Sequence, residues 1–361
     1  MGNVIDMPLF MDLHKAADYE VKPTLDDIKR NHIADLAVQD KYGVKFLQYW
    51  INEEEGLVFC LMEAPDKESC VAVHQEAHGG MPCNVIELQG GDYKAFAGDE
   101  TRKNEFDIAE KANGNLDTGY RLIMVADFLT VAENDLMQED IGNIVNKSGG
   151  HFLSRPVNRK IIVFTQGARA IECATGIIQF VKQLSDKTIE VRIGISAGEP
   201  VTDQQDIFAD AIQLANRMCD IAHDGQVIIS SHAQKMTELH HHSEGNSLKI
   251  LNPENEQFLN VLSEAVDFLL FKTSFNIDNL SKHLGMSRSH LYRKIKDLTG
   301  YSANSFIQEL RMQRALQLIR NKYGNITQVA LESGFSNLSY FARSFQKRFG
   351  VLPLKAAKLS Q

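Results

Sequence analysis

The C-terminal part of the chain contains the same short pattern twice, and this repeat constrains the fold more than any other feature. The first copy spans residues 277–294 and the second spans residues 326–343, an offset of 49 residues. In each copy an apolar, helix-forming stretch is followed by Gly-x-Ser and then by a second amphipathic stretch. An internal repeat of this kind indicates two copies of one supersecondary unit.

Each copy has the pattern of a helix-turn-helix. Gly285 and Gly334 follow the first helix, where glycine can adopt the left-handed conformation that ends a helix. Ser287 and Ser336 come two residues later, and we expect their hydroxyls to cap the second helix. The second helices are expected to bury one apolar face each, made by Leu291, Ile295, Phe341 and Phe345.

The opposite face of each second helix is polar and basic, which suits the major groove of double-stranded DNA. Residues 255–361 hold 15 Lys and Arg against 7 Asp and Glu, whereas the rest of the chain has a net charge of −17. A basic module on an acidic chain indicates that this module contacts a polyanion. The alternative is a helical packing module. The candidate DNA contacts are Arg288, Ser289, Tyr292, Arg293, Lys296, Asn337, Leu338, Ser339 and Arg343.

Residues 258–358 resemble the DNA-binding domain of the AraC/XylS family of bacterial transcription regulators. The resemblance is carried by the second copy, from Ile326-Thr-Gln-Val-Ala through Gly-Phe-Ser-Asn-Leu-Ser to Phe-Gly-Val-Leu-Pro353. It implies an all-α double helix-turn-helix, with the two units joined by a long helix over residues 302–320 and entering successive major grooves.

Length and composition predict a multidomain α+β protein of two or three domains. We place the domains at residues 1–97, 117–238 and 255–361. No apolar run reaches the roughly 18 residues that a membrane span needs, and the first residues lack a secretory pattern, so we expect a cytoplasmic protein. Reduced thiols are the simplest interpretation of the odd number of cysteines. These are Cys60, Cys70, Cys83, Cys173 and Cys219.

The middle segment, residues 118–236, alternates apolar strands with amphipathic helices, which is typical of an α+β sandwich. Strands are expected at 121–128, 152–153, 160–164, 189–198 and 226–230, and helices at 134–147, 167–184 and 207–222. The segment is similar to the catalytic domain of class III adenylate and guanylate cyclases. The similarity lies in Val125-Ala-Asp127, Gly149-Gly150, Gly194-Ile-Ser-Ala-Gly198-Glu199, Ala215-Asn-Arg217 and Gly225-Gln-Val-Ile-Ile-Ser230.

The resemblance also implies that catalysis has been lost. In that family two Asp residues hold two metal ions at the triphosphate. Asp127 matches the first, but the second position falls on Asn158, and Arg159 beside it would repel a divalent cation. Arg217 matches the family's transition-state Arg. Asp127 and Arg217 are thus expected to be vestigial nucleotide-binding residues, or merely packing residues, in a domain that dimerises or senses a nucleotide.

The N-terminal segment has a β-α-β-β-α-β order, which predicts a ferredoxin-like α+β domain. Within it, His74 and His78 are spaced i, i+4 on one helix, so both project from one face and could share a metal ion. Imidazole and thiolate ligands favour Ni, Zn or Cu over Mg or Ca. The alternative is that these are ordinary surface histidines. Further candidate ligands in this domain are His14, His32, Cys60 and Glu63.

A third resemblance supports metal binding. The strings Cys60-Leu-Met-Glu-Ala-Pro65 and His74-Gln-Glu-Ala-His78-Gly resemble a small bacterial nickel-binding, ferredoxin-like family over residues 7–96. The resemblance implies nickel as the metal and a domain that dimerises through its sheet.

Together, these features predict a metal- or ligand-responsive transcription regulator of the AraC/XylS type. It would be a non-enzyme that binds double-stranded DNA as a homodimer and takes a divalent transition metal, a small molecule or a nucleotide as effector. Two alternatives remain open. One is a nucleotide cyclase with a DNA-binding tail, and the other is a metal-storage protein with a regulatory scaffold.

Overall fold

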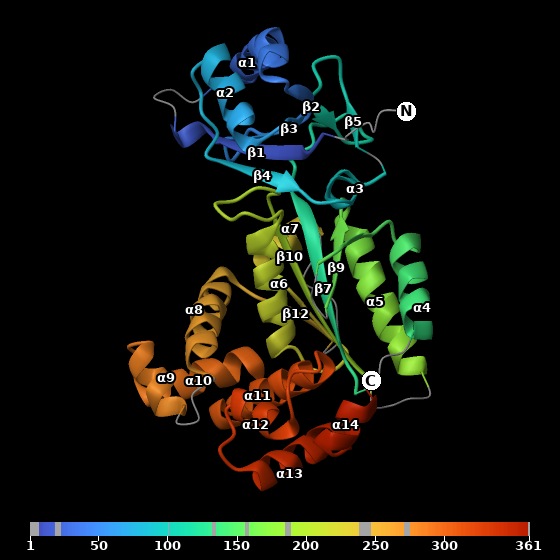
Figure 1. Ribbon diagram of the computed structural model, residues 1–361, viewed down its shortest axis with the longest axis vertical. Coiled ribbons are helices and arrows are strands. Elements are labelled where there is room, and N and C mark those ends of the chain that lie inside the picture. The colour runs from blue at the N-terminus through green and yellow to red at the C-terminus, as the bar shows by residue number, and fades with distance from the viewer. Residues whose placement is uncertain are drawn as a thin grey trace.

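The structure, a computed structural model, consists of three units that follow one another along its long axis (Figure 1). An N-terminal sheet domain lies at one end, a larger sheet domain lies in the middle, and a helical module lies at the other end. Among the described residues, no helix combines the length and the apolar character needed to cross a bilayer. The structure describes residues 7–18, 23–99, 101–131, 135–155, 159–184, 189–237, 247–270 and 275–359.

The N-terminal domain confirms the expected ferredoxin-like order. Its sheet has the order β2-β3-β1-β4, every neighbouring pair is antiparallel, and α1 and α2 pack together. Both helices begin where the sequence supplies a cap, a capping box at Thr24 for α1 and Asp66 for α2. The elements are β1 (Leu9–Lys15), η1 (Ala16–Asp18), α1 (Leu25–Val38), η2 (Gln39–Tyr42), β2 (Lys45–Asn52), β3 (Leu57–Glu63), α2 (Lys67–Ala77), β4 (Asn84–Leu88) and α3 (Asp92–Ala97).

Alternation along β1 divides this sheet between two cores. Phe10 belongs to a core that also holds residues of α1 and α2, whereas Met11 and Leu13 belong to a core shared with the middle domain. The second core includes Trp50, whose ring lies 4.6 Å from that of Phe96 in α3. The sheet face opposite the helices is therefore packed against the protein's own middle segment.

The polar segment of residues 101–117 is structured. A short hairpin of β5 (Arg102–Lys103) and β6 (Ala109–Glu110) lies beside β2, and the backbone N–H of Tyr49 donates to the carbonyl of Asp107. Ile108 and Ala109 are fully buried. Tertiary packing accounts for this burial, because the surrounding segment is polar.

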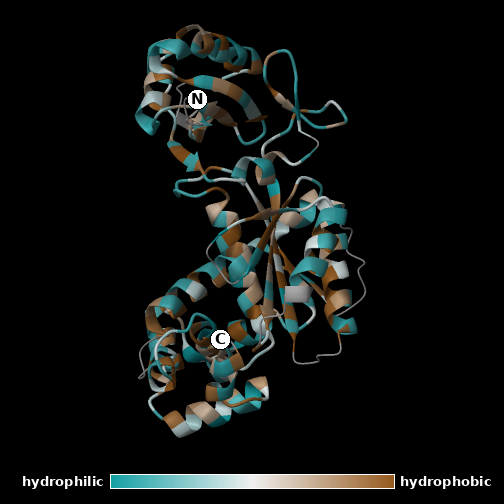
Figure 2. Ribbon diagram, turned by 45° about the vertical axis from the view of Figure 1, so that its right-hand side comes forward, coloured by the Kyte–Doolittle hydropathy of each residue, from teal (hydrophilic) through white to brown (hydrophobic). Residues whose placement is uncertain are grey.

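The middle domain is a six-stranded sheet of order β12-β11-β10-β7-β9-β8. Its central strand β7 is buried along its whole length, and alternate residues supply two different cores. Leu122 and Met124 face the helices α4 and α5, whereas Ile123 and Val125 share a core with α6 and α8. Figure 2 shows these hydrophobic strands between two-toned amphipathic helices. The elements are β7 (Arg121–Leu129), α4 (Asp135–Lys147), β8 (His151–Leu153), β9 (Lys160–Phe164), α5 (Gly167–Gln183), β10 (Glu190–Gly198), α6 (Ala209–Ile221), β11 (Gln226–Ile229), α7 (Ser231–Met236) and β12 (Leu248–Ile250).

The C-terminal module is all-helical and contains the two expected helix-turn-helix units, α9–α10 and α12–α13, joined by the long helix α11. Gly285 and Gly334 have φ angles of 61° and 81°, which confirms the left-handed turns. Ser287 caps α10 as expected, but Asn337 rather than Ser336 caps α13, because the Asn337 side chain accepts from the Tyr340 N–H. The elements are α8 (Pro253–Leu269), α9 (Ile277–His283), α10 (Arg288–Thr299), α11 (Ala303–Arg320), α12 (Ile326–Glu332), α13 (Leu338–Phe349) and α14 (Pro353–Leu359).

Candidate metal centre and DNA interface

Titratable side chains from three elements meet between the N-terminal sheet and its helices. Asp12 projects from β1, Asp35 from α1 and His74 from α2, and all three are at most 3% exposed. His74 Nδ1 lies 3.0 Å from Asp35 Oδ1, and its Nε2 lies 2.8 Å from Asp12 Oδ2. Burial alone would lower the pKa of His74, but the two carboxylates outweigh it and raise this pKa to about 10. His74 is therefore an imidazolium held by two carboxylates.

Two groups of potential ligand atoms share His74. One is Asp12, His14, Cys60 and His74, and the other is Asp35, His74 and His78. His14 Nε2 lies 3.5 Å from Asp12, and the backbone N–H of Cys60 donates to Asp12 Oδ1 at 3.1 Å. Burial, followed by the charge of Asp12, holds the pKa of the Cys60 thiol well above its usual value.

The donor set fits a transition metal. Nitrogen and sulfur ligands suit Ni, Zn or Cu, and carboxylate oxygens can complete their coordination. Metal–ligand bonds of about 2.0–2.3 Å place atoms on opposite sides of one ion at most about 4–5 Å apart. The ligand atoms within each group lie within 4.8 Å of one another. A metal bound here would displace the protons of His74 and Cys60, because ligands bind in their deprotonated forms.

The structure brings together four of the six predicted ligands: His14, Cys60, His74 and His78. His32 is buried but stands apart, with Nε2 3.6 Å from Asp107 Oδ2. Glu63 lies outside both groups, because it ends β3 and pairs with Lys45 at 3.4 Å.

Sequence reasoning missed two carboxylates, Asp12 and Asp35. Each had a signal. Asp12 interrupts an apolar strand two residues before His14, so both side chains project from one face of the sheet. Asp35 follows His32 by one helical turn. Neither signal indicates that α1 and α2 would place Asp35 beside His74.

A cavity of about 200 Å³ opens beside this cluster. It is lined by His14, His32, His74 and Tyr49, by aliphatic side chains of α1, β2 and β3, and by the polar side chains of Asn31, Asn52 and Glu53. Three buried atoms in its wall make no hydrogen bond among the described residues: His14 Nε2, His32 Nε2 and Tyr49 Oη. Burial, its largest cause, lowers the pKa of His32, and burial likewise raises the pKa of Tyr49.

The predicted DNA-reading faces of α10 and α13 are on the surface. Leu291, Ile295, Phe341 and Phe345 are fully buried, which confirms the predicted apolar faces. Of the nine candidate DNA contacts, all are exposed except Tyr292, which is half-buried. These nine are Arg288, Ser289, Tyr292, Arg293, Lys296, Asn337, Leu338, Ser339 and Arg343.

Local contacts orient several of these side chains. Arg288 pairs with Asp278 at 3.2 Å and lies over the ring of Tyr292, 5.7 Å from its centroid. Arg343 Nε donates to the Ser339 carbonyl at 3.4 Å, one turn back along α13. The Asn337 side chain is engaged as the helix cap, which leaves less of it for a base.

Two carboxylates of the middle domain, Asp127 and Asp220, hold an arginine. The Arg159 guanidinium lies 3.0 Å from Asp127 Oδ2 and 2.5 Å from Asp220 Oδ1. Burial alone would lower the pKa of Arg159, but Asp220 and Asp127 raise it well above its usual value. Arg217 donates to Asn260 at 2.7 Å and to Glu264 at 3.2 Å, both on α8. Position 158, where the sequence has Asn in place of a metal ligand, lies outside the described residues.

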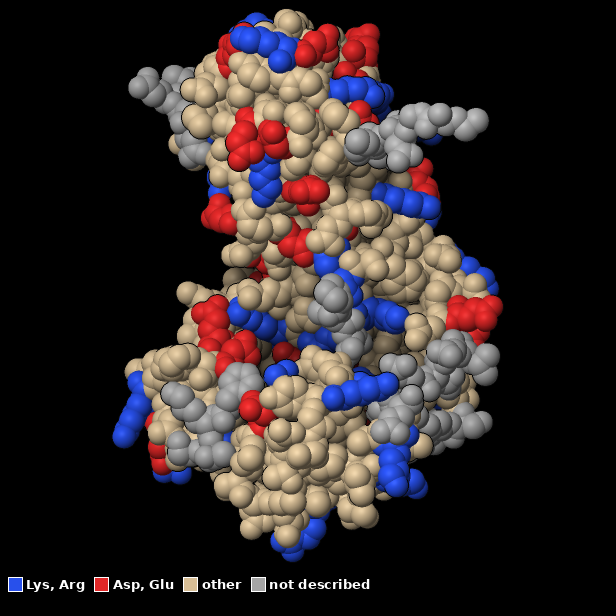
Figure 3. All heavy atoms as spheres, in the orientation of Figure 1, with Lys and Arg blue, Asp and Glu red and all other residues tan. Residues whose placement is uncertain are grey.

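Asp127 and Arg217 also line a cavity of about 320 Å³ that α6 and β7 form with α8 and α11. These two residues thus face the C-terminal helices of the same chain. Figure 3 shows Lys and Arg side chains gathered where the middle domain meets those helices.

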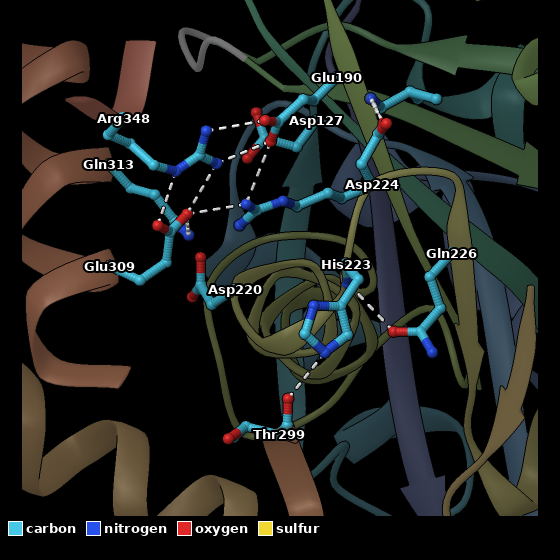
Figure 4. A network of polar contacts seen from close by, with 12 residues as sticks. Asp127, Glu190, Asp220, His223, Asp224, Gln226, Thr299, Glu309, Gln313 and Arg348 are labelled. Carbon is cyan, nitrogen blue, oxygen red and sulfur yellow. Dashed lines mark hydrogen bonds and ion pairs between the residues drawn. The ribbon is translucent and has the colours of Figure 1, made fainter. Parts of the chain in front are cut away.

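A polar network joins the second helix-turn-helix unit to β10 (Figure 4). Arg348, in the last turn of α13, donates to both carboxylate oxygens of Glu190 at 2.7 Å and to Glu309 of α11 at 2.7 and 2.9 Å. Arg192 Nη2 donates to Glu309 at 2.8 Å. Separately, the ring of His223 contacts the Thr299 carbonyl at the end of α10, with 2.9 Å between Nε2 and the oxygen. Each helix-turn-helix unit is therefore anchored to the middle domain at its own point.

Comparisons with known proteins agree with this geometry. Residues 280–358 match the family described as a helix-turn-helix domain, and residues 10–88 match the nickel-responsive protein SCO4226-like family. The chain is 31% identical over 88 residues to the Msm operon regulatory protein of Streptococcus mutans, which covers 24% of this chain and 32% of that protein. It spans about a third or less of the length of the first curated relatives that it matches.

Two solved structures are similar to parts of the chain. SCO4226 from Streptomyces coelicolor is 34% identical and corresponds to 22% of this chain and 94% of that one, with a TM-score of 0.20. The guanylyl cyclase domain of the RhoGC fusion protein from Blastocladiella emersonii is 17% identical and corresponds to 33% and 85%, with a TM-score of 0.29. At its two ends the chain thus matches two different families, a helix-turn-helix domain over residues 280–358 and a nickel-responsive domain over residues 10–88.

Proposed function

We propose that this protein is a DNA-binding transcription regulator of the AraC/XylS type that acts in the cytoplasm. The observation that carries the proposal is the exposure of both predicted reading faces, on α10 and α13, in a module that matches a helix-turn-helix family. The three functional units are residues 1–97 for sensing, 117–238 for transmission and 255–361 for DNA binding. We also propose that the protein acts as a homodimer.

The signal is a divalent transition metal, with nickel the first choice. The buried His, Asp and Cys groups around His74 support it, as does the match to the nickel-responsive family. A metal can regulate only if its affinity differs between states of different DNA affinity. It would replace the proton of His74, and so change the contacts that tie α2 to β1 and α1.

The middle domain is proposed to transmit the signal without catalysis. Two-metal phosphoryl transfer requires carboxylates that are free to hold cations. Asp127 and Asp220 are instead neutralised by Arg159, and Arg217 is engaged by α8. Production of cyclic nucleotide from ATP or GTP with Mg²⁺ or Mn²⁺ by the purified protein would contradict this assignment.

DNA recognition is tested with Arg293→Ala and Arg343→Ala. The operator would first be selected from genomic fragments, and affinity would then be measured for it and for random DNA. If each arginine pairs with guanine, each change costs about 1–3 kcal/mol on the operator and relaxes the sequence preference. Lys355→Ala on α14 serves as a control of equal charge change. Equal weakening on operator and random DNA would reassign the arginines to phosphate contacts.

Metal sensing is tested by titrating the full chain with Ni²⁺, Zn²⁺ and Cu²⁺ while measuring operator affinity. His74→Ala should abolish tight metal binding, because His74 belongs to both ligand groups. Glu63→Gln should retain it, because Glu63 lies outside them. Metal binding with unchanged DNA affinity would instead support a metal-storage protein.

A further inference from the structure

The cavity beside the metal centre extends well beyond the potential ligand atoms. Its wall away from His74 is formed by α1 and by the adjoining ends of β2 and β3. The aliphatic side chains in that wall are Leu25, Ile28, Ile51, Leu57 and Val58. A metal ion contacts only its ligands, so this apolar wall has no part in holding one. It offers the surface that an organic molecule buries on binding.

Two polar groups of this cavity lie on the same side. The rings of His32 and Tyr49 contact each other, with centroids 4.5 Å apart. His32 is 6% exposed and Tyr49 1% exposed; Tyr49 Oη makes no hydrogen bond among the described residues, and His32 Nε2 lies 3.6 Å from Asp107 Oδ2, beyond hydrogen-bond distance. Buried polar atoms in native proteins nearly always have a partner, so these two atoms are suited to a bound molecule.

Size and charge define the class of that molecule. A cavity of about 150 Å³ accommodates benzene, so a cavity of about 200 Å³ accommodates one substituted ring. Two carboxylates line it: Asp35, which His74 already holds, and Glu53, whose negative charge disfavours an anionic ligand. An uncharged ligand with a single hydrogen-bonding substituent therefore complements the lining.

We propose that this cavity binds an uncharged one-ring organic molecule that bears a hydroxyl group. Its ring packs against Ile28, Ile51 and the neighbouring aliphatic side chains, and its hydroxyl exchanges hydrogen bonds with Tyr49 and His32. The inference rests on the proposed function only in placing an organic effector in the same sensing domain as the metal. The domain would then respond to a metal and an organic molecule together.

The test uses phenol and cyclohexanol as probes, with toluene and benzoate for comparison, in calorimetric titrations of the full chain. We expect saturable binding of phenol and cyclohexanol at one site per chain, and weaker binding of charged benzoate. Tyr49→Phe should weaken phenol at least tenfold while leaving toluene unchanged, because it removes only the hydroxyl. Tyr93→Phe, on the exposed face of α3, is the matched control and should have no effect.

Ile28→Trp and, independently, Val58→Phe fill the cavity and should abolish binding of both alcohols. Nickel titration of the same variants shows whether the domain is folded and separates the two proposals. If nickel binds but neither alcohol does, or if both filled variants still bind phenol as the parent chain does, the organic site is refuted and the metal response stands. If phenol binds in a Tyr49-dependent manner but no metal does, the organic site stands and the metal response fails.

Discussion

The network between β10 and the second helix-turn-helix unit makes a quantitative prediction for Glu309→Gln. Glu309 is 8% exposed and accepts hydrogen bonds from Arg192, Gln313 and Arg348. The substitution keeps the shape of the side chain and removes its charge. Arg348 would keep its two bonds to Glu190, whereas buried Arg192 would be left with Glu190 at 3.4 Å.

Two independent estimates of the free-energy cost of Glu309→Gln agree. Burial alone would raise the pKa of Glu309, but the hydrogen bonds from Arg348 and the charge of Arg192 lower it from 4.5 to about 2. That difference corresponds to about 3 kcal/mol of stabilisation of the charged form. Removing one partner of a buried ion pair typically costs about 3–5 kcal/mol. We therefore expect Glu309→Gln to destabilise the docking of α11 and α13 by about 3 kcal/mol.

Native-state hydrogen exchange, measured by mass spectrometry on peptides of α11 and α13, reports this change locally. A loss of about 3 kcal/mol corresponds to roughly 100-fold faster exchange at pH 7. The control is Glu254→Gln, which removes the ion pair with Lys294 from a side chain that is 77% exposed. Its effect should stay below about 0.5 kcal/mol. If Glu309→Gln changes exchange less than threefold, the network does not hold the module.

The remaining predictions concern pH, backbone and charge. Because the pKa of Glu309 is lowered, its stabilisation is fully present above pH 4.5 and is lost as pH falls toward 2. The free energies of unfolding of the parent chain and of Glu309→Gln, measured by urea denaturation, should therefore converge toward pH 2. Gly334→Ala should cost at least about 1 kcal/mol more than Gly285→Ala in urea denaturation, because a Cβ at 334 would lie 2.7 Å from a backbone oxygen whereas one at 285 meets nothing within 4 Å. Equal costs would refute the packing argument. Arg159→Ala should lower the stability of the middle domain by about 3 kcal/mol, because it leaves Asp127 facing Asp220, and an unchanged unfolding midpoint would show that the arginine is dispensable.

The local sequence pattern was sufficient to predict most of the helices and strands. The helix-turn-helix repeat is determined by spacing within about twenty residues, so Gly285, Gly334 and the buried faces of α10 and α13 could all be read from the chain. The exception is the cap of α13. Ser336 and Asn337 are both good caps, and the structure uses Asn337. Adjacent candidates of equal propensity cannot be separated by pattern alone.

The candidate metal site was predictable only in part. The i, i+4 spacing of His74 and His78 is a local property, and both residues do join one ligand group, although α2 ends at Ala77 and His78 is its C-cap residue rather than part of the helix. Asp12 and Asp35 are added by strands and helices that are distant in sequence, and Glu63 is turned away by its position at the end of β3. Which side chains form a ligand set depends on which elements pack together, and the sequence of a single element does not determine that packing.

The sequence by itself determined the kinds of element, their order and the chemistry that each face carries, because helical and strand periodicities are written in neighbouring residues. Only the tertiary structure decided which faces meet. It packed the open face of the N-terminal sheet against the chain's own middle segment and placed Arg159 between Asp127 and Asp220. It also joined Arg348 to Glu190 across 158 residues. Such contacts arise from the burial of whole surfaces, a property that belongs to the packed chain rather than to any segment of it.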